Sequence, residues 1–330
     1  MKMFDENELY GICGQGSYQA IIEYLESCDD GAEWLEKYED LFESGNYVFE
    51  IDDSDIQKIL WAYEDYLKHV FVTKMTTREY KKYAFACLKD FFPDAKDFDD
   101  LEKAIPRYFE RRGYFANFGV VSPLPSLTLW KKQTKHELEV ELPEATVAMN
   151  VYEMDEIVTR GWYDYLTFGK VGTGGWVSLD GCYYFKQFYD VDSEAFTVSL
   201  LKHEGQHFHD QGINFAMPSH ELEYRAKLVE LIYLQEQSVF NSFLANMSDD
   251  INNPHGHANK RIITSLSKLI FDEELVTDKD RWSAEYEKVS AAALQLLKED
   301  TATSKWLRKR VLIWRGKLRR KLVQWLKKTA

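Results

Sequence analysis

Cysteine is scarce in this chain of 330 residues, and its four cysteines lie far apart in the sequence. No two of them form a C-x-x-C pair, so neither a disulfide-bonded small domain nor a cysteine-rich zinc site is indicated. The first residues, Met1 to Glu6, lack the basic start and the apolar run of a secretory signal. We therefore expect reduced cysteines and a cytoplasmic location. The cysteines are Cys13, Cys28, Cys87 and Cys182.

Long apolar segments are missing as well. The longest stretch without a charged residue lies between Arg112 and Lys131, and it contains two glycines and two prolines. A membrane-spanning helix rarely tolerates this combination, so we expect loop and short strand there.

Basic residues are few outside the C-terminal segment. The chain has 41 Lys and Arg against 55 Asp and Glu, a formal net charge of −14. Eleven of the basic residues, and no acidic one, lie between Lys305 and Lys328, which leaves 30 basic against 55 acidic residues elsewhere. An acidic body should not attract nucleic acid. The basic segment has an apolar helical face, so it either packs on the acidic body, which we favour, or contacts a membrane surface or a partner.

The residues that are present indicate an α+β fold. Up to residue 115 apolar side chains recur three or four positions apart, as in helices. Glu137 to Leu142 alternate between apolar and charged residues, as a half-buried strand does. Helical spacing returns at Ser193. Further β-rich stretches are 147–154, 161–168 and 176–185, and the later helices are expected at 193–211, 219–246, 258–273, 280–298 and 303–328.

This order predicts three regions around a small mixed or antiparallel sheet. Residues 1–115 would form an N-terminal helical region, 116–246 a central α+β core, and 247–330 a C-terminal helical region.

The segment His203-Glu204-Gly205-Gln206-His207 fits the pattern H-E-x-x-H. On a helix, residues four apart lie on one face, so both imidazoles can reach one zinc ion. Glu204 lies beside the first ligand but off the ligand stripe, which suits a general base acting on water. The segment predicts a zinc site of hydrolytic type on a helix.

A hydrolytic zinc site needs a third protein ligand and an open position. Some H-E-x-x-H proteins place a histidine six residues after the second ligand, but that position is Ile213 here. Glu221 and Glu223 follow at the start of the next predicted helix. They are two residues apart and point in different directions, so we expect only one of them to face the metal.

H-E-x-x-H followed by a helical E-x-x-A, here Glu223 to Ala226, resembles the gluzincin branch of zinc metallopeptidases. The resemblance covers about residues 193–232. It implies a zincin-like core, a zinc ion held by His203, His207 and Glu223, and Glu204 as the catalytic carboxylate. It also implies a peptide or protein substrate.

The sequence departs from many gluzincins at Lys227. Those proteins carry an acid there, four residues after the glutamate ligand, and it orients a histidine ligand. Asp210 or another acid is expected to take that role here.

A peptidase also needs a donor for the oxyanion of the tetrahedral intermediate. The loop from Asn252 to Asn259 carries two histidines, and we favour His257, with Tyr224 second. The strand predicted at 174–181 is either an edge that pairs with an extended peptide or an ordinary core strand.

Two other functions remain open. The chain could be a catalytically silent binding module that docks a partner through its basic C-terminal helix. It could also be a toxin or effector peptidase with one protein target. The sequence does not distinguish endopeptidase from exopeptidase action.

Overall fold

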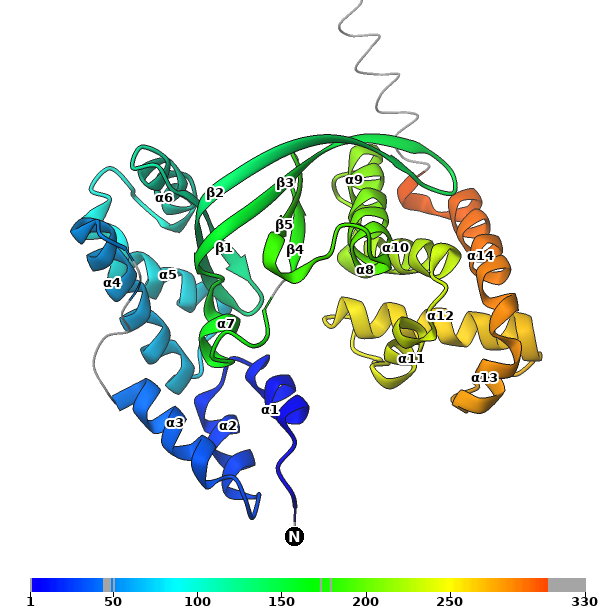
Figure 1. The fold of residues 1–330 in the computed structure, drawn as a ribbon, viewed down its shortest axis with the longest axis horizontal. Helices are drawn as coiled ribbons and strands as arrows, with labels where there is room; N and C mark the ends of the chain where they lie inside the picture. The colour runs from blue at the N-terminus through cyan, green and yellow to red at the C-terminus, as the bar shows by residue number, and fades with distance from the viewer. Residues whose placement is uncertain (1, 44–48, 50, 173, 179, 308–330) are drawn as a thin grey trace, which may run out of the picture. The chain divides into compact units, whose positions relative to one another are not determined.

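The structure is a computed structural model that describes residues 2–43, 49, 51–172, 174–178 and 180–307. The chain forms two compact units (Figure 1). One contains Met1–Thr134 and Met154–Gly174, and the other contains Lys135–Glu153 and Gly175–Ala330. These boundaries differ from those expected after residues 115 and 246, because two long strands each run through both units.

The fold is mixed α+β, as predicted. Its five-stranded sheet has the order β1-β2-β3-β5-β4, so β4 is an edge strand. β1 pairs antiparallel with β2 in a register that places Phe115 opposite Trp130, and β4 pairs antiparallel with β5. The strands are β1 (Phe115–Val121), β2 (Leu124–Glu141), β3 (Thr146–Thr159), β4 (Gly175–Ser178) and β5 (Gly181–Phe185).

The first unit surrounds an aromatic-rich core. Tyr38, Tyr63, Tyr66 and Phe109 are among its largest fully buried side chains. Burial of such rings supplies most of the stabilisation of a helical unit of this kind. Its helices are α1 (Glu6–Cys13), α2 (Tyr18–Glu26), α3 (Ala32–Glu43), α4 (Ser54–Val72), α5 (Thr77–Leu88), α6 (Phe98–Glu110) and α7 (Trp162–Leu166), with a 3₁₀ turn at Lys89–Phe91.

The second unit has its own core, to which both β-strands and helices contribute. Val140 and Val151 come from β2 and β3, and Leu228, Ile262 and Leu297 come from three different helices. The helices are α8 (Glu194–Phe196), α9 (His203–Ile213), α10 (Ser219–Tyr233), α11 (Gln237–Ala245), α12 (Pro254–Phe271), α13 (Lys279–Glu285) and α14 (Val289–Thr303), with 3₁₀ turns at Lys186–Phe188 and Tyr286–Lys288.

The expectation of β-structure at 161–168 was wrong, because Trp162–Leu166 form the short helix α7. Gly161 precedes it with φ of 100°, a backbone conformation that glycine adopts at low cost. A Cβ atom there would lie 2.0 Å from Ser126 Oγ. The apolar residues of the segment serve the core of this helix, where Trp162 and Leu166 are buried, rather than strand pairing.

The single helix expected at 219–246 is interrupted between α10 and α11. Leu234 is extended, with ψ of 133°, and the Glu194 carboxylate accepts hydrogen bonds from the backbone N–H groups of Gln235 and Glu236. A side-chain acceptor therefore replaces the helical carbonyls at the break.

The helix expected at 280–298 is likewise divided, into α13, a 3₁₀ turn and α14. Most of the basic helix expected at 303–328 lies outside the described residues, which end at Leu307.

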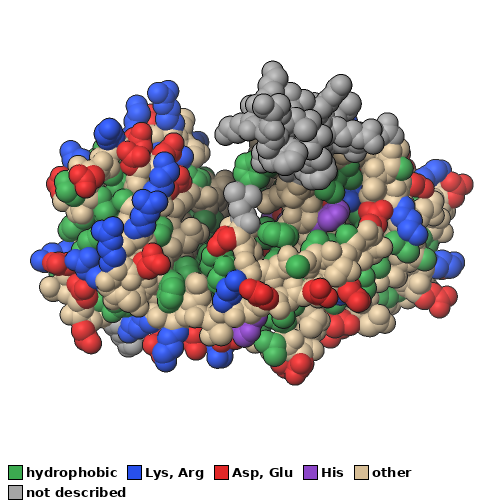
Figure 2. Space-filling view, turned by 90° about the horizontal axis from the view of Figure 1, so that it is seen from above, with side chains coloured by type: hydrophobic (Ala, Val, Ile, Leu, Met, Phe, Trp, Pro, Cys, Tyr) green, Lys and Arg blue, Asp and Glu red, His purple; other side chains and the backbone are tan. Residues whose placement is uncertain are grey.

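Among the described residues, no helix has the length and apolar character needed to span a bilayer. Acidic and basic side chains both occur across the face of the molecule shown in Figure 2.

Candidate metal centre

The helix that carries the H-E-x-x-H segment begins with a capped turn. The Ser193 side chain accepts a hydrogen bond from the Phe196 backbone N–H, which caps α8. A π-helical turn, Thr197–Lys202, then leads directly into α9 at His203. π-helical turns are rare and frequently occur at functional sites.

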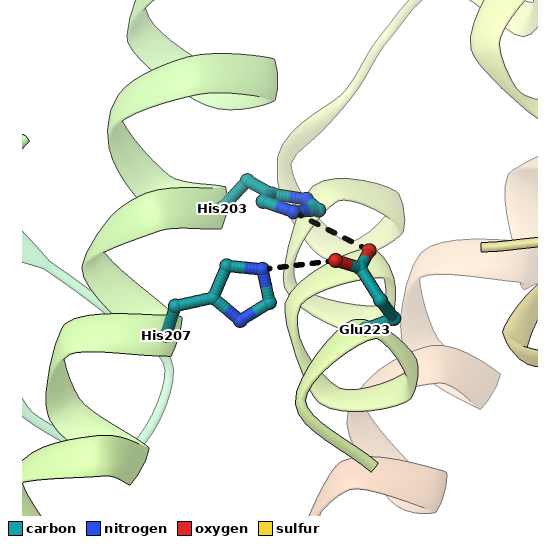
Figure 3. Close-up of side chains that lie close together, drawn as sticks. All are labelled: His203, His207 and Glu223. Carbon is teal, nitrogen blue, oxygen red and sulfur yellow. Dashed lines mark ion pairs between the residues drawn. The ribbon is translucent and has the colours of Figure 1, made fainter. Parts of the chain in front are cut away.

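His203, His207 and Glu223 converge on one point from α9 and α10 (Figure 3). His203 Nε2 lies 3.6 Å from Glu223 Oε2, and His207 Nε2 lies 3.4 Å from Glu223 Oε1. One nitrogen or oxygen atom from each of the three side chains lies within 4.8 Å of the others. Tetrahedral zinc with bonds of about 2.0–2.1 Å separates its ligand atoms by roughly 3.3 Å. The spacing therefore fits one small cation between the three side chains.

Two buried polar atoms of these side chains have no aligned hydrogen bond in the described structure. They are Glu223 Oε2 and His207 Nδ1. Only 12% of the Glu223 side chain is exposed. A buried carboxylate costs free energy unless positive charge or donors surround it, and a bound cation would reduce that cost. The burial of Glu223 beside two imidazoles is thus an observation of this structure that favours a metal ligand.

The electrostatics at the centre describe an ionised cluster. Burial raises the pKa of Glu223, but the imidazoles of His207, His255 and His203 outweigh burial and hold this pKa well below its usual range. Burial lowers the pKa of His207, but the carboxylates of Glu223 and Glu204 raise this pKa by a larger amount, so the net shift is upward. The Glu204 charge thus acts at the same point as the proposed ligands.

Glu230 contacts His203 through the ring nitrogen that does not face Glu223. Its Oε1 pairs with His203 Nδ1, while His203 Nε2 faces Glu223. A carboxylate on one ring nitrogen fixes the tautomer and leaves the other nitrogen free to bind a metal. The sequence interpretation missed Glu230. Its spacing could have indicated this role, because Glu230 follows Glu223 by seven residues, or two helical turns, on the same face of α10.

Asp210, the acid named for that orienting role, has a different one. It is fully buried and accepts hydrogen bonds from Arg225 Nε at 2.7 Å and Gln206 Nε2 at 2.9 Å. Arg225, also fully buried, reaches Asp300 at 3.0 Å through NH1. This buried ion network joins α9, α10 and α14 behind the two helices that carry the proposed ligands.

Glu221 and Glu223 diverge, as expected for residues two apart. Glu221 Oε2 accepts a hydrogen bond of 2.8 Å from Arg261 on α12, and Glu223 faces the histidines. Arg261 also covers the buried ring of Tyr224, 3.5 Å from its centroid. Tyr224, the second candidate for the oxyanion donor, therefore packs between helices.

The histidine pair of the 252–259 loop lies in the first turn of α12. His255 Nδ1 lies 2.9 Å from Glu223 Oε2, and 67% of the His255 side chain is exposed. His257, which we favoured as the oxyanion donor, instead packs edge-on against His220, and its Nδ1 is buried without a hydrogen-bond partner in the described structure. The loop does reach the centre, but through His255.

α9 contacts both β4 and β5 within the second unit. The edge strand β4 therefore lies beside the helix that carries His203 and His207. Searches of protein-family models, curated proteins and solved structures found no match to this chain.

Proposed function

We propose that the chain is a zinc-dependent hydrolase with a gluzincin-like centre, and that it cleaves peptide bonds. The observation that carries the proposal is the convergence of His203 Nε2, His207 Nε2 and the Glu223 carboxylate within 4.8 Å. Two nitrogens and one carboxylate from facing helices match the donor set of hydrolytic zinc sites. The burial of the Glu223 carboxylate and the Glu230 partner of His203 support it.

The bound zinc would supply a Lewis acid and would lower the pKa of a water molecule at the open position. Glu204 would accept the proton of the attacking water and deliver it to the leaving amine. His203 and His207 would bind the metal through Nε2, with Glu230 fixing the His203 tautomer. An extended peptide would pair with β4, the last strand in the sheet order, through main-chain hydrogen bonds.

The catalytically silent alternative depends on the basic segment, whose residues from 308 onward lie outside the described structure. No contact in the described residues favours that alternative over the enzyme.

Zinc content tests the proposal most directly. The purified protein should hold about one zinc per chain, as expected for a site with three protein ligands. His203→Ala removes one of the three ligands and should abolish this content, as measured by elemental analysis after dialysis. His136→Ala, at an exposed position on β2, is the matched control and should keep its zinc. Wild-type protein without zinc, or equal zinc in the His203→Ala variant, would contradict the proposal.

A further inference from the structure

His255 is the group closest to the second oxygen of the proposed glutamate ligand. Its Nδ1 lies 2.9 Å from Glu223 Oε2, the oxygen that has no aligned hydrogen bond. The His255 ring is two-thirds exposed, so it has room to turn an Nδ1–H group onto that oxygen. Glu223, in contrast, is largely buried and fixed between the two helices that flank it.

A tight turn at the start of α12 holds His255 in place. The Asn253 side chain caps the helix by accepting from the Gly256 N–H at 3.0 Å, and the Ser248 N–H donates to the Gly256 carbonyl at 2.9 Å. A Cβ atom on Gly256 would lie 2.7 Å from both Asn253 Nδ2 and Ser248 Cβ. Only glycine allows this close approach, so the turn that presents His255 is built into the sequence.

α12 is also fastened to α10 through Arg261. Arg261 donates to Glu221, two residues before Glu223, and also to Asp300 at 3.0 Å. The first turn of α12 therefore has a defined position relative to Glu223, and the short His255–Glu223 distance is a product of helix packing.

A carboxylate that binds a metal through one oxygen leaves the other oxygen in need of a donor. Ligating carboxylates are commonly hydrogen-bonded in this way, and the donor both fixes the carboxylate and tunes metal affinity. We propose that His255 is a positioning residue that holds Oε2 of Glu223 and so keeps Glu223 a one-oxygen metal ligand. This inference rests on the proposed function, because it concerns the same centre.

The role has a counterpart on the opposite side of the centre. The Glu230 carboxylate contacts Nδ1 of His203, and His255 would donate a hydrogen bond to Oε2 of Glu223. Two of the three proposed ligands would then be fixed from behind by residues that do not bind the metal. Such partners typically contribute 10- to 100-fold in metal affinity.

The test uses three variants of the full chain, His255→Ala, His255→Asn and His136→Ala. Zinc affinity is measured by competition with a chromophoric chelator, and the visible absorption spectrum is recorded with Co²⁺ in place of zinc. His255→Ala should bind zinc about 10- to 100-fold more weakly. Its Co²⁺ spectrum should change, because Glu223 becomes free to bind through both oxygens.

His255→Asn places an amide N–H near the position of Nδ1 and should recover most of the affinity and the wild-type spectrum. His136→Ala, the exposed control, should match wild type. The thermal unfolding midpoint without metal should be similar for all three, since the His255 side chain is largely exposed.

The outcomes separate the two proposals. If wild type binds neither zinc nor Co²⁺, the proposed function fails. If wild type binds both and His255→Ala has wild-type affinity and spectrum, only the role of His255 fails. Equal weakening in the Ala and Asn variants would also overturn that role, because the donor N–H would then not be the cause.

Discussion

Glu204→Gln should keep its zinc and lose hydrolysis by about 10²- to 10⁴-fold, the usual contribution of a positioned general base. The amide has the size of the carboxylate but cannot accept the proton of the attacking water. Glu204 is not among the three converging side chains, so metal binding does not depend on it. Cleavage of a mixture of fluorescence-quenched peptides, measured at equal zinc content, would provide the comparison.

Glu274→Gln is the matched control for this experiment, because Glu274 is an exposed glutamate of the same unit between α12 and α13. It should cleave as fast as wild type. If the Glu204→Gln variant cleaved as fast as wild type, Glu204 would not be the general base. Wild-type protein that holds zinc but cleaves no peptide in the mixture would favour a single protein target or a silent module.

Arg225→Leu should lower the free energy of unfolding by about 3–5 kcal/mol, the typical cost of breaking a buried ion pair by removing one partner. The leucine would leave Asp210 and Asp300 buried without their shared cation. Both carboxylates are more than nine-tenths buried, so water cannot easily replace the guanidinium. Urea denaturation of the metal-free protein, followed by circular dichroism, measures the change.

Arg281→Leu provides the comparison, because Arg281 pairs with Glu273 on the surface. Surface pairs contribute little, so this variant should unfold close to wild type. If both arginine variants unfolded at the same denaturant concentration as wild type, the buried network would not be what joins α9, α10 and α14.

The three proposed ligands could be found in the sequence because their signals are local. His203 and His207 are one helical turn apart, and that spacing alone puts them on one face. The opposite directions of residues two apart in a helix left one glutamate facing the metal, and the E-x-x-A resemblance from Glu223 to Ala226 selected Glu223 over Glu221. Glu230 was missed because its role depends on how α10 packs beside α9, and the family pattern directed attention to residue 227 instead.

The choice between His255 and His257 shows a second limit of prediction from the sequence. The loop was correctly expected to approach the centre, but the helix was expected to begin at 258 and begins at Pro254. Side chains two residues apart on a helix differ in direction by roughly 200°. Because α12 begins before both histidines, His255 faces Glu223 and His257 faces His220. A boundary error of four residues thus changed which side chain reached the site.

At fold level, periodicity located most helices and the paired strands, but tertiary contacts decided the exceptions. The segment at 161–168 has the aromatic content of a strand and folds as α7, because its buried side chains pack from a helix. The break after Tyr233 depends on Glu194, forty residues earlier in the chain, so no local pattern could have revealed it.

The long strands β2 and β3 have a consequence for dissecting the protein. The half that carries the histidines takes four buried side chains from these strands and the turn between them, namely Val140, Leu142, Met149 and Val151. A truncated gene that starts at residue 175 would delete this hydrophobic layer and expose its partners to water. A minimal version should retain 135–153 and replace only residues 154–174 with a short linker, so that the hairpin stays covalently attached to the helices it covers.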